Sequence, residues 1–199
     1  MKVTVTIDGG SREVERGTTY EAVVKEYQPA YDNTIAAVAA NGRIRELFKK
    51  INRDCTITFF TWKDNVGHKT YVRTATMLFF KAVFDVFGAE SARTSRLEFA
   101  VGHGYYIDPG DKIEATAENA AKIKARMREI VDAGTPFMKK TCPLDEAMDI
   151  FKAQGMKDKE KLFRYRMNSQ VNLYQIDGYY DYYYGYMLPS TGYLTAYED

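Results

Sequence analysis

The sequence predicts an α+β fold made of two domains, over residues 1–62 and 63–199. In the first sixty residues, short runs of alternating apolar and polar residues surround one helix-like segment, and such alternation is typical of half-buried strands. A polar, turn-rich stretch at residues 62–67 marks the boundary. Beyond it, segments with apolar residues three and four apart alternate with strand-like runs. A chain of 199 residues is long enough to bury two cores.

A hairpin and a helix are predicted at the start of the N-terminal domain. Residues 3–7 alternate between apolar and polar types, an Asp-Gly turn follows, and residues 11–16 form the returning strand. Thr18 and Glu21 fit a capping box, in which the Thr18 hydroxyl accepts a backbone hydrogen bond at the start of a helix. Pro29 ends this helix because it lacks the backbone donor that would continue it.

A second hairpin and a last strand complete the N-terminal domain. Residues 35–40 and 43–48 flank Asn41-Gly42, a dipeptide that strongly indicates a tight hairpin turn. Residues 54–60 alternate again and form the closing strand. Five strands and one helix in this order predict a β-grasp domain, in which the helix crosses a small mixed sheet.

The N-terminal domain resembles the TGS family, a ubiquitin-like module of threonyl-tRNA synthetases, stringent-response enzymes and some GTPases. The resemblance rests on Gly17-Thr18-Thr19 and on the hairpin A-A-N-G-R-I-R-E-L at residues 39–47. Basic residues gather at this hairpin and in the loop after it. They are explained either by a solvated sheet edge that discourages edge pairing or by a contact with phosphate. The basic residues are Arg43, Arg45, Lys49, Lys50 and Arg53.

The second domain is predicted to combine helices with a hairpin and a strand. Met77, Phe80, Phe84 and Phe87 recur with helical spacing, and a glycine-rich turn follows the strand-like run that begins at Arg96. The predicted elements are, in order, a helix over 72–87, a hairpin over 96–108, helices over 118–133, 144–154 and 158–167, a strand over 171–176 and a tyrosine-dense C-terminal segment.

Three segments of the second domain resemble the editing domain of threonyl- and alanyl-tRNA synthetases. They are the hairpin L-E-F-A-V-G-H-G-Y-Y-I-D at residues 97–108, the helix at 143–151 and the segment D-Y-Y-Y-G-Y-M-L-P-S-T-G at 181–192. That family chelates a metal ion with an H-x-x-x-H pair on its long helix and with a Cys and a His in the last segment. The resemblance therefore implies an α+β editing-domain fold for residues 63–199.

The four positions that align with these metal ligands carry residues that do not ligate metal well. Arg73 and Met77 replace the histidine pair, Tyr183 replaces the cysteine, and Met187 replaces the last histidine. Arginine is a permanent cation, and Met and Tyr are poor zinc ligands. The sequence thus predicts no metal and no deacylase chemistry. Arg73 is either a solvated or salt-bridged helix residue or a group that binds an anion in the cleft inherited from the editing domain. In the second case, the other three residues would form the wall of that cleft.

Composition narrows the classes of function. A formal net charge of +1 argues against nucleic acid as a partner, and no apolar run reaches the length that spans a membrane. Cys55 and Cys142 without a C-x-x-C motif, and an N-terminus without an apolar signal segment, predict a cytoplasmic protein. The two histidines, His68 and His103, leave little for a zinc site or a His-based triad, and His103 is predicted to be a turn residue.

The chain also resembles the N-terminal half of bacterial nucleoside kinases of the uridine kinase type. The resemblance rests on residues 141–166 and on the string Y-Y-Y-G-Y-M-L-P-S-T-G-Y-L at 182–194. Such chains carry a TGS domain, a synthetase-like domain without metal ligands, and a P-loop domain that transfers the γ-phosphate of ATP or GTP to a nucleoside 5′-hydroxyl with Mg²⁺. None of the 14 glycines begins a G-x-x-x-x-G-K-[ST] motif. The resemblance therefore implies a non-catalytic front part without a cofactor of its own, with the kinase domain expected beyond residue 199.

The function of this front part stays open among three interpretations. As part of a kinase, it would contact its own kinase domain and sense a nucleoside or nucleotide, with oligomerisation left open. The alternative is a tRNA-binding or editing-type module, and the third interpretation is a scaffold that fixes the oligomer. Seven tyrosines fall within residues 174–186. We expect them to form one of three features: a sheet core with one solvent-exposed face, a nucleotide pocket, or a docking surface for the kinase domain. In the pocket interpretation, Tyr180, Tyr182 and Tyr184 line the ligand.

Overall fold

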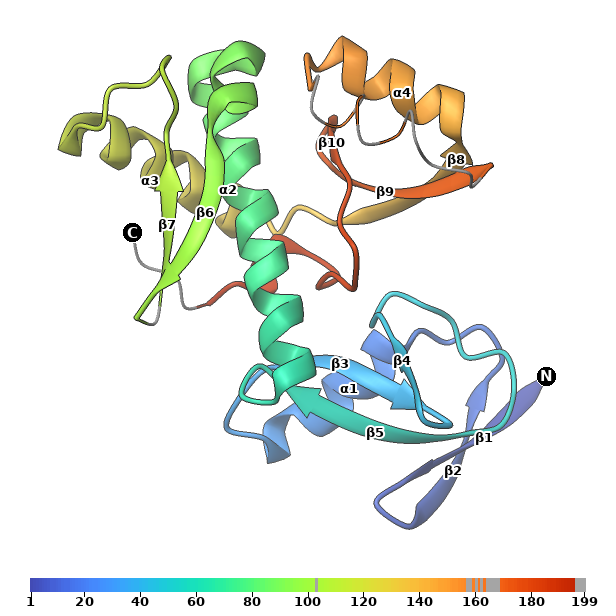
Figure 1. Cartoon of the computed structure of the whole chain (residues 1–199). Helices are drawn as coiled ribbons and strands as arrows, with labels where there is room; N and C mark the ends of the chain where they lie inside the picture. The colour runs from blue at the N-terminus through green and yellow to red at the C-terminus, as the bar shows by residue number, and fades with distance from the viewer. Residues whose placement is uncertain (103, 157–158, 160, 162, 164–168, 196–199) are drawn as a thin grey trace.

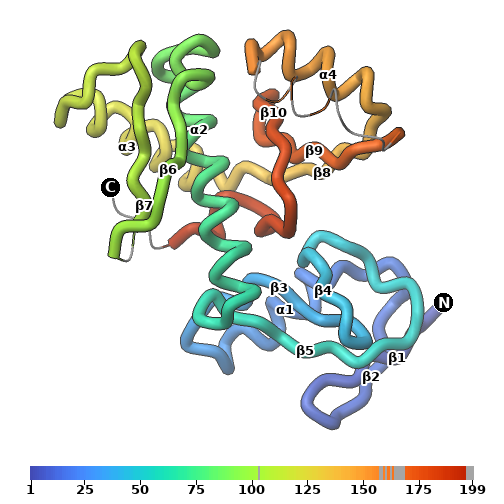
Figure 2. The backbone as a smooth tube through the Cα atoms, in the orientation of Figure 1, coloured from blue at the N-terminus to red at the C-terminus, as the bar shows by residue number. Residues whose placement is uncertain are grey.

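The architecture is a mixture of helices and three β-sheets arranged around one long helix (Figure 1). The computed structural model describes residues 1–102, 104–156, 159, 161, 163 and 169–195. Helix α2 spans Asn65–Thr94, with the five-stranded N-terminal sheet at its first turn and the two smaller sheets on either side of its later turns (Figure 2). This arrangement confirms the predicted α+β fold class. Within the described ranges, none of the helices combines the length and apolar character needed to cross a bilayer.

The N-terminal sheet has the strand order β2-β1-β5-β3-β4, with β1 and β5 parallel and the other neighbours antiparallel. One helix, α1 (Tyr20–Tyr27), is followed by the short 3₁₀ turn η1 (Gln28–Ala30). This is the expected β-grasp arrangement of one helix on a mixed sheet. The strands are β1 (Lys2–Ile7), β2 (Gly10–Glu15), β3 (Ile35–Ala40), β4 (Arg43–Arg45) and β5 (Cys55–Thr61).

Both predicted hairpin turns adopt the backbone that their sequences favour. Asp8 and Asn41 each have φ of 50°, and each is followed by a glycine with positive φ, which is the geometry that a tight type I′ hairpin requires. The predicted cap at Thr18 is wrong by one residue. Thr19 is the N-cap, and its hydroxyl accepts from the Ala22 N–H at 3.2 Å, because the Thr18 carbonyl already accepts from Ile51 N–H.

Two predicted elements end at different residues from those expected. The strand predicted over 43–48 stops at Arg45, because the next two residues, Glu46 and Leu47, are buried. The helix predicted over 72–87 extends from Asn65 to Thr94, with a non-helical break at Gly88, whose φ is 84°. A glycine permits this conformation, which side chains with a Cβ rarely adopt.

The second part of the chain packs helices and two small sheets around α2. Strand β8 lies outside every predicted element, although it pairs antiparallel with β9 over six residues, from Met138↔Gln175 to Pro143↔Gln170. The helix predicted over 158–167 falls largely outside the described residues. The elements after α2 are β6 (Arg96–Val101), β7 (Gly104–Asp108), α3 (Ala117–Asp132), β8 (Met138–Pro143), α4 (Leu144–Ala153), β9 (Gln170–Ile176), β10 (Tyr179–Asp181) and η2 (Thr191–Tyr193).

Helix α2 begins directly against the end of the N-terminal sheet. A Cβ at Gly67 would lie 1.9 Å from the Thr61 carbonyl oxygen, so only glycine permits this approach. The Asp64 carboxylate accepts from the Thr61 N–H and hydroxyl at 2.6 and 2.9 Å. The Tyr193 hydroxyl, near the C-terminus, donates to Glu21 on α1 at 3.0 Å. These contacts join the start of α2 and the C-terminal segment to the N-terminal part of the chain, while the division into domains at residue 62 stays a prediction.

Candidate ligand-binding site

Arg73 on α2 occupies the place predicted for a former metal ligand and contacts the C-terminal segment. Its guanidinium donates to the Tyr186 carbonyl oxygen at 2.7 Å. It also covers Gly185, where a Cβ would lie only 2.4 Å from the guanidinium carbon. Burial lowers the pKa of Arg73 from its ordinary value, although Tyr174 and Glu46 nearby oppose that shift. The side chain therefore acts as an internal tether and does not project into open space.

The two methionines of the predicted site are core residues. Met77 and Met187 are both fully buried. The Thr74 hydroxyl lies 3.6 Å from the Met187 sulfur and accepts from the Leu188 N–H at 3.0 Å. The segment after Gly185 is thus docked against α2. Within the part of the chain that the structure describes, no three His, Cys, Asp or Glu side chains are grouped so as to hold a metal ion.

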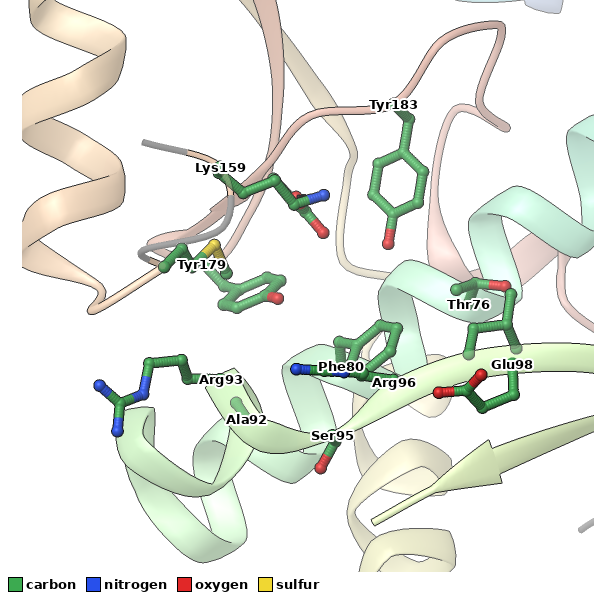
Figure 3. Close-up of a pocket in the computed structure, with 13 residues that line it drawn as sticks. Thr76, Phe80, Ala92, Arg93, Ser95, Arg96, Glu98, Lys159, Tyr179 and Tyr183 are labelled. Atoms are coloured by element: carbon green, nitrogen blue, oxygen red, sulfur yellow. Dashed lines mark ion pairs between the residues drawn. The ribbon is translucent and has the colours of Figure 1, made fainter. Parts of the chain in front are cut away.

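A pocket of about 490 Å³ lies beside this filled region, between the later turns of α2, strand β6 and strand β10 (Figure 3). Tyr183 is the one member of the predicted four that lines it; Arg73, Met77 and Met187 do not. Figure 3 shows the Tyr183 ring with its hydroxyl directed toward the space in front of Phe80 and Thr76. We call this space the pocket.

The Tyr183 hydroxyl is buried and makes no hydrogen bond of good geometry among the described residues, although the Asp181 carboxylate lies close enough to interact with it. Burial raises the pKa of Tyr183 well above its ordinary value, and the nearby Asp181 carboxylate adds to this shift. The hydroxyl therefore stays protonated at neutral pH. A buried polar group without a partner costs about 1–3 kcal/mol, which makes this hydroxyl a ready donor for a ligand.

Charged side chains of both signs surround the Tyr183 hydroxyl. Burial raises the pKa of Asp181, although Lys159 opposes this shift through an ion pair at 3.1 Å. Arg93 and Arg96, at the end of α2 and the start of β6, line the opposite wall. Glu98 lines the pocket as well, so a ligand there would meet hydrogen-bond donors together with charges of both signs.

The tyrosines predicted to line a ligand differ from those that line this pocket. Tyr179 and Tyr183 line the pocket, whereas Tyr180, Tyr182 and Tyr184 do not. Tyr182 packs against Phe163 in an edge-to-face arrangement, and Tyr184 is 88% exposed. Tyr179 and Asp181 are buried on one side of β10. The sequence does not predict which tyrosines face this side, because a run of tyrosines has no contrast between polar and apolar residues.

The fold and the site together define a class: an N-terminal β-grasp sheet joined to an editing-domain-like α+β part, whose expected metal positions are filled by other side chains. The comparisons agree with this class, because the similar proteins are threonyl-tRNA synthetases, matched by their N-terminal region. No family model matches the chain.

The chain is similar to several curated threonine–tRNA ligases. It is 28% identical to that of Symbiobacterium thermophilum over 196 residues, which cover 96% of this chain and 29% of the ligase. It is 28% identical to that of Thermotoga maritima over 200 residues, covering 100% and 30%. For the ligase of Porphyromonas gingivalis strain W83 the identity is 24% over 195 residues, covering 95% and 29%. The chain therefore spans about 30% of the length of these relatives.

Proposed function

We propose that this chain is a non-hydrolytic tRNA-binding module whose pocket receives the terminal nucleotide of the RNA. The observation that carries the proposal is the contrast between two neighbouring places. Arg73 fills the region where a metal would have activated water. The adjacent pocket stays open, with the buried hydroxyl of Tyr183 unpaired among the described residues. Such a site suits binding without cleavage.

The chemistry of the pocket suits a nucleotide. Its volume of about 490 Å³ lies within the usual range for small-ligand sites, roughly 300–1,000 Å³. Phe80, which is partly exposed, supplies aromatic surface on which a base can stack. Arg96 supplies a guanidinium group that pairs well with phosphate, whereas Arg93 is already paired with Glu90 at 3.7 Å.

The same residues argue against hydrolysis. Water attacks an ester at a useful rate only when a metal or a general base activates it. Arg73 is a cation and cannot ligate a metal. The raised pKa of Tyr183 keeps its hydroxyl protonated, so it donates a hydrogen bond and does not accept a proton from water.

Titration with adenosine 5′-monophosphate tests the proposal, because this nucleotide matches the terminal residue of tRNA. We expect Tyr183→Phe to weaken binding about tenfold, the effect of one charge-assisted or buried hydrogen bond. Tyr184→Phe is the matched control, because Tyr184 is 88% exposed and its substitution should leave the affinity unchanged.

Two results would contradict the proposal. One is the absence of any calorimetric or NMR response of the unsubstituted chain to millimolar adenosine 5′-monophosphate. The other is accelerated hydrolysis of an aminoacyl-tRNA ester by the chain, with or without added Zn²⁺, because the pocket is proposed to bind and not to cleave.

A second candidate function rests on the string at residues 182–194 that resembles nucleoside kinases. In that case the pocket would take a nucleoside or nucleotide effector for a kinase domain that uses ATP or GTP and Mg²⁺. None of the relatives reported above is a nucleoside kinase, so the sequence string alone supports it. Sequencing the gene beyond codon 199 separates the candidates: a G-x-x-x-x-G-K-[ST] motif supports the kinase, and a class II synthetase domain opposes it.

A further inference from the structure

A second cavity lies where the N-terminal sheet meets strand β8, away from the pocket. Its volume is about 1020 Å³. One side is formed by β4 and the loop that follows it, and the other by β8 and Tyr186. We call this cavity the basic groove, because six cationic side chains line it. They are Arg16, Arg45, Lys49, Lys50, Arg53 and Lys139.

The charges of the basic groove are not balanced within the protein. Among the described residues, Glu46 is the only carboxylate that lines it. This side chain is buried, and it is occupied by the Lys139 ammonium at 3.2 Å and by the Tyr174 hydroxyl. None of the five remaining cations forms an ion pair with another of the described residues. A chain with a net charge of only +1 thus concentrates positive charge at one place.

The loop that carries the cations is held in one conformation. Leu47 and Ile51 are fully buried and anchor it, while the side chains between them and after them face outward. Backbone hydrogen bonds join it to the segment before α1: Gly17 N–H to Ile51 at 2.8 Å, Tyr20 N–H to Lys49 at 3.0 Å and Glu21 N–H to Leu47 at 2.7 Å. The cations are therefore positioned before any ligand arrives, which lowers the entropic cost of binding.

Protection of the sheet edge explains only part of this cluster. Strand β4 is an edge strand, so Arg43 and Arg45 fit the role of discouraging strand pairing. Lys49, Lys50 and Arg53 lie in the loop beyond β4 and outside the ladder. Their position between the N-terminal sheet and strand β8 fits recognition of an extended anion better than it fits edge protection.

We propose that the basic groove binds the phosphodiester backbone of RNA. This inference deepens the proposed function, on which it rests, by giving the RNA a second site in addition to the pocket. Phe48 and Tyr186 provide aromatic faces in the groove, and Lys49 Nζ lies 5.4 Å from the centre of the Phe48 ring. Cations interleaved with aromatic rings are typical of sites that track a nucleic-acid backbone and stack its bases, and they favour RNA over an acidic protein segment.

The test uses tRNA that lacks its 3′-terminal adenosine, so that the pocket is not engaged. Binding is measured by filter retention across a series of salt concentrations. We expect the double variant Lys49→Gln/Lys50→Gln to bind about tenfold more weakly near 0.1 M salt. We also expect the slope of log affinity against log salt concentration to fall by the equivalent of one to two phosphate contacts. The matched control, Lys122→Gln/Lys152→Gln, changes two exposed lysines on α3 and α4 and should alter the affinity by less than about twofold.

Three results would overturn the groove assignment: equal weakening by both lysine pairs, no weakening by either, or polyglutamate competing as well as RNA at equal charge. The last of these would identify an acidic protein as the occupant. A groove-dependent affinity for trimmed tRNA, together with no response of the pocket to adenosine 5′-monophosphate, would contradict the proposed function while supporting the groove. The two failures are therefore distinguishable.

Discussion

The pocket and the basic groove are built on opposite principles. In the pocket, Asp181 and Lys159 neutralise each other, and the group without a partner is a neutral hydroxyl, that of Tyr183. In the groove, the carboxylate of Glu46 is already occupied, and the unpaired groups are cations. The pocket is thus suited to a small ligand that is selected by hydrogen bonds and stacking. The groove is suited to a polyanion that is attracted over a longer range.

A short stretch of chain joins the two cavities. Tyr183 lines the pocket and Tyr186 lines the groove, three residues later. Between them, the Gly185 carbonyl lies 2.7 Å from the Tyr174 hydroxyl, and Arg73 holds the Tyr186 carbonyl. The polar contacts of Arg73 and Tyr174 therefore connect the walls of both cavities.

The largest effect on stability is expected from Glu46→Ala. This change leaves Lys139, the Tyr174 hydroxyl and the Met187 N–H without their common partner. We expect the free energy of unfolding to fall by about 3 kcal/mol, the usual cost of breaking a buried charged network. Urea unfolding measures it. Glu13→Ala is the control, because its ion pair with Lys2 is exposed, and a comparable loss there would contradict the special role of Glu46.

A smaller effect is expected from Gly185→Ala. The new methyl group would displace the Arg73 guanidinium and break its hydrogen bond to Tyr186. Together with the positive φ of 138° at this position, we expect a cost of about 2 kcal/mol in thermal or urea unfolding. Gly178→Ala separates the two causes, because Gly178 also has positive φ but has nothing near its Cβ. Equal costs at both glycines would show that the Arg73 contact contributes nothing.

The smallest effect comes from removing single hydroxyls. Tyr183→Phe should leave stability unchanged or raise it by up to about 1 kcal/mol, because it deletes a buried hydroxyl that lacks a partner. Tyr174→Phe should lower stability by about 1–2 kcal/mol, because this hydroxyl contacts Glu46 and the Gly185 carbonyl. Chemical denaturation of both variants compares them. A clear loss on Tyr183→Phe would mean that the hydroxyl already has a structural partner.

Local patterns predicted the elements whose turns carry strong signals. The Asp-Gly and Asn-Gly hairpins form as expected, and the alternation at residues 3–7 became β1. Strand β8 was not predicted, because its sequence M-K-K-T-C-P shows no clear alternation and it is stabilised by pairing with β9. Such non-local pairing leaves little trace in a short window of sequence.

The candidate sites depended even more on tertiary structure. The net charge of +1 suggested that nucleic acid is not a partner, but composition averages over the whole surface. The groove gathers Arg16, the loop after β4 and Lys139 from distant parts of the chain. Likewise, Arg73 was identified from its aligned position, while its contact with Gly185 lies 112 residues further along the chain and could be found only in the folded protein.

The most direct test of the central claim compares the affinity of the chain for intact tRNA with that for the same tRNA without its 3′-terminal adenosine. If the pocket takes the terminal nucleotide and the groove takes the backbone, intact tRNA should bind about tenfold more tightly, and the two salt dependences should differ by no more than about one phosphate contact. Equal affinities would contradict the account, because they would leave the pocket without a role in RNA binding.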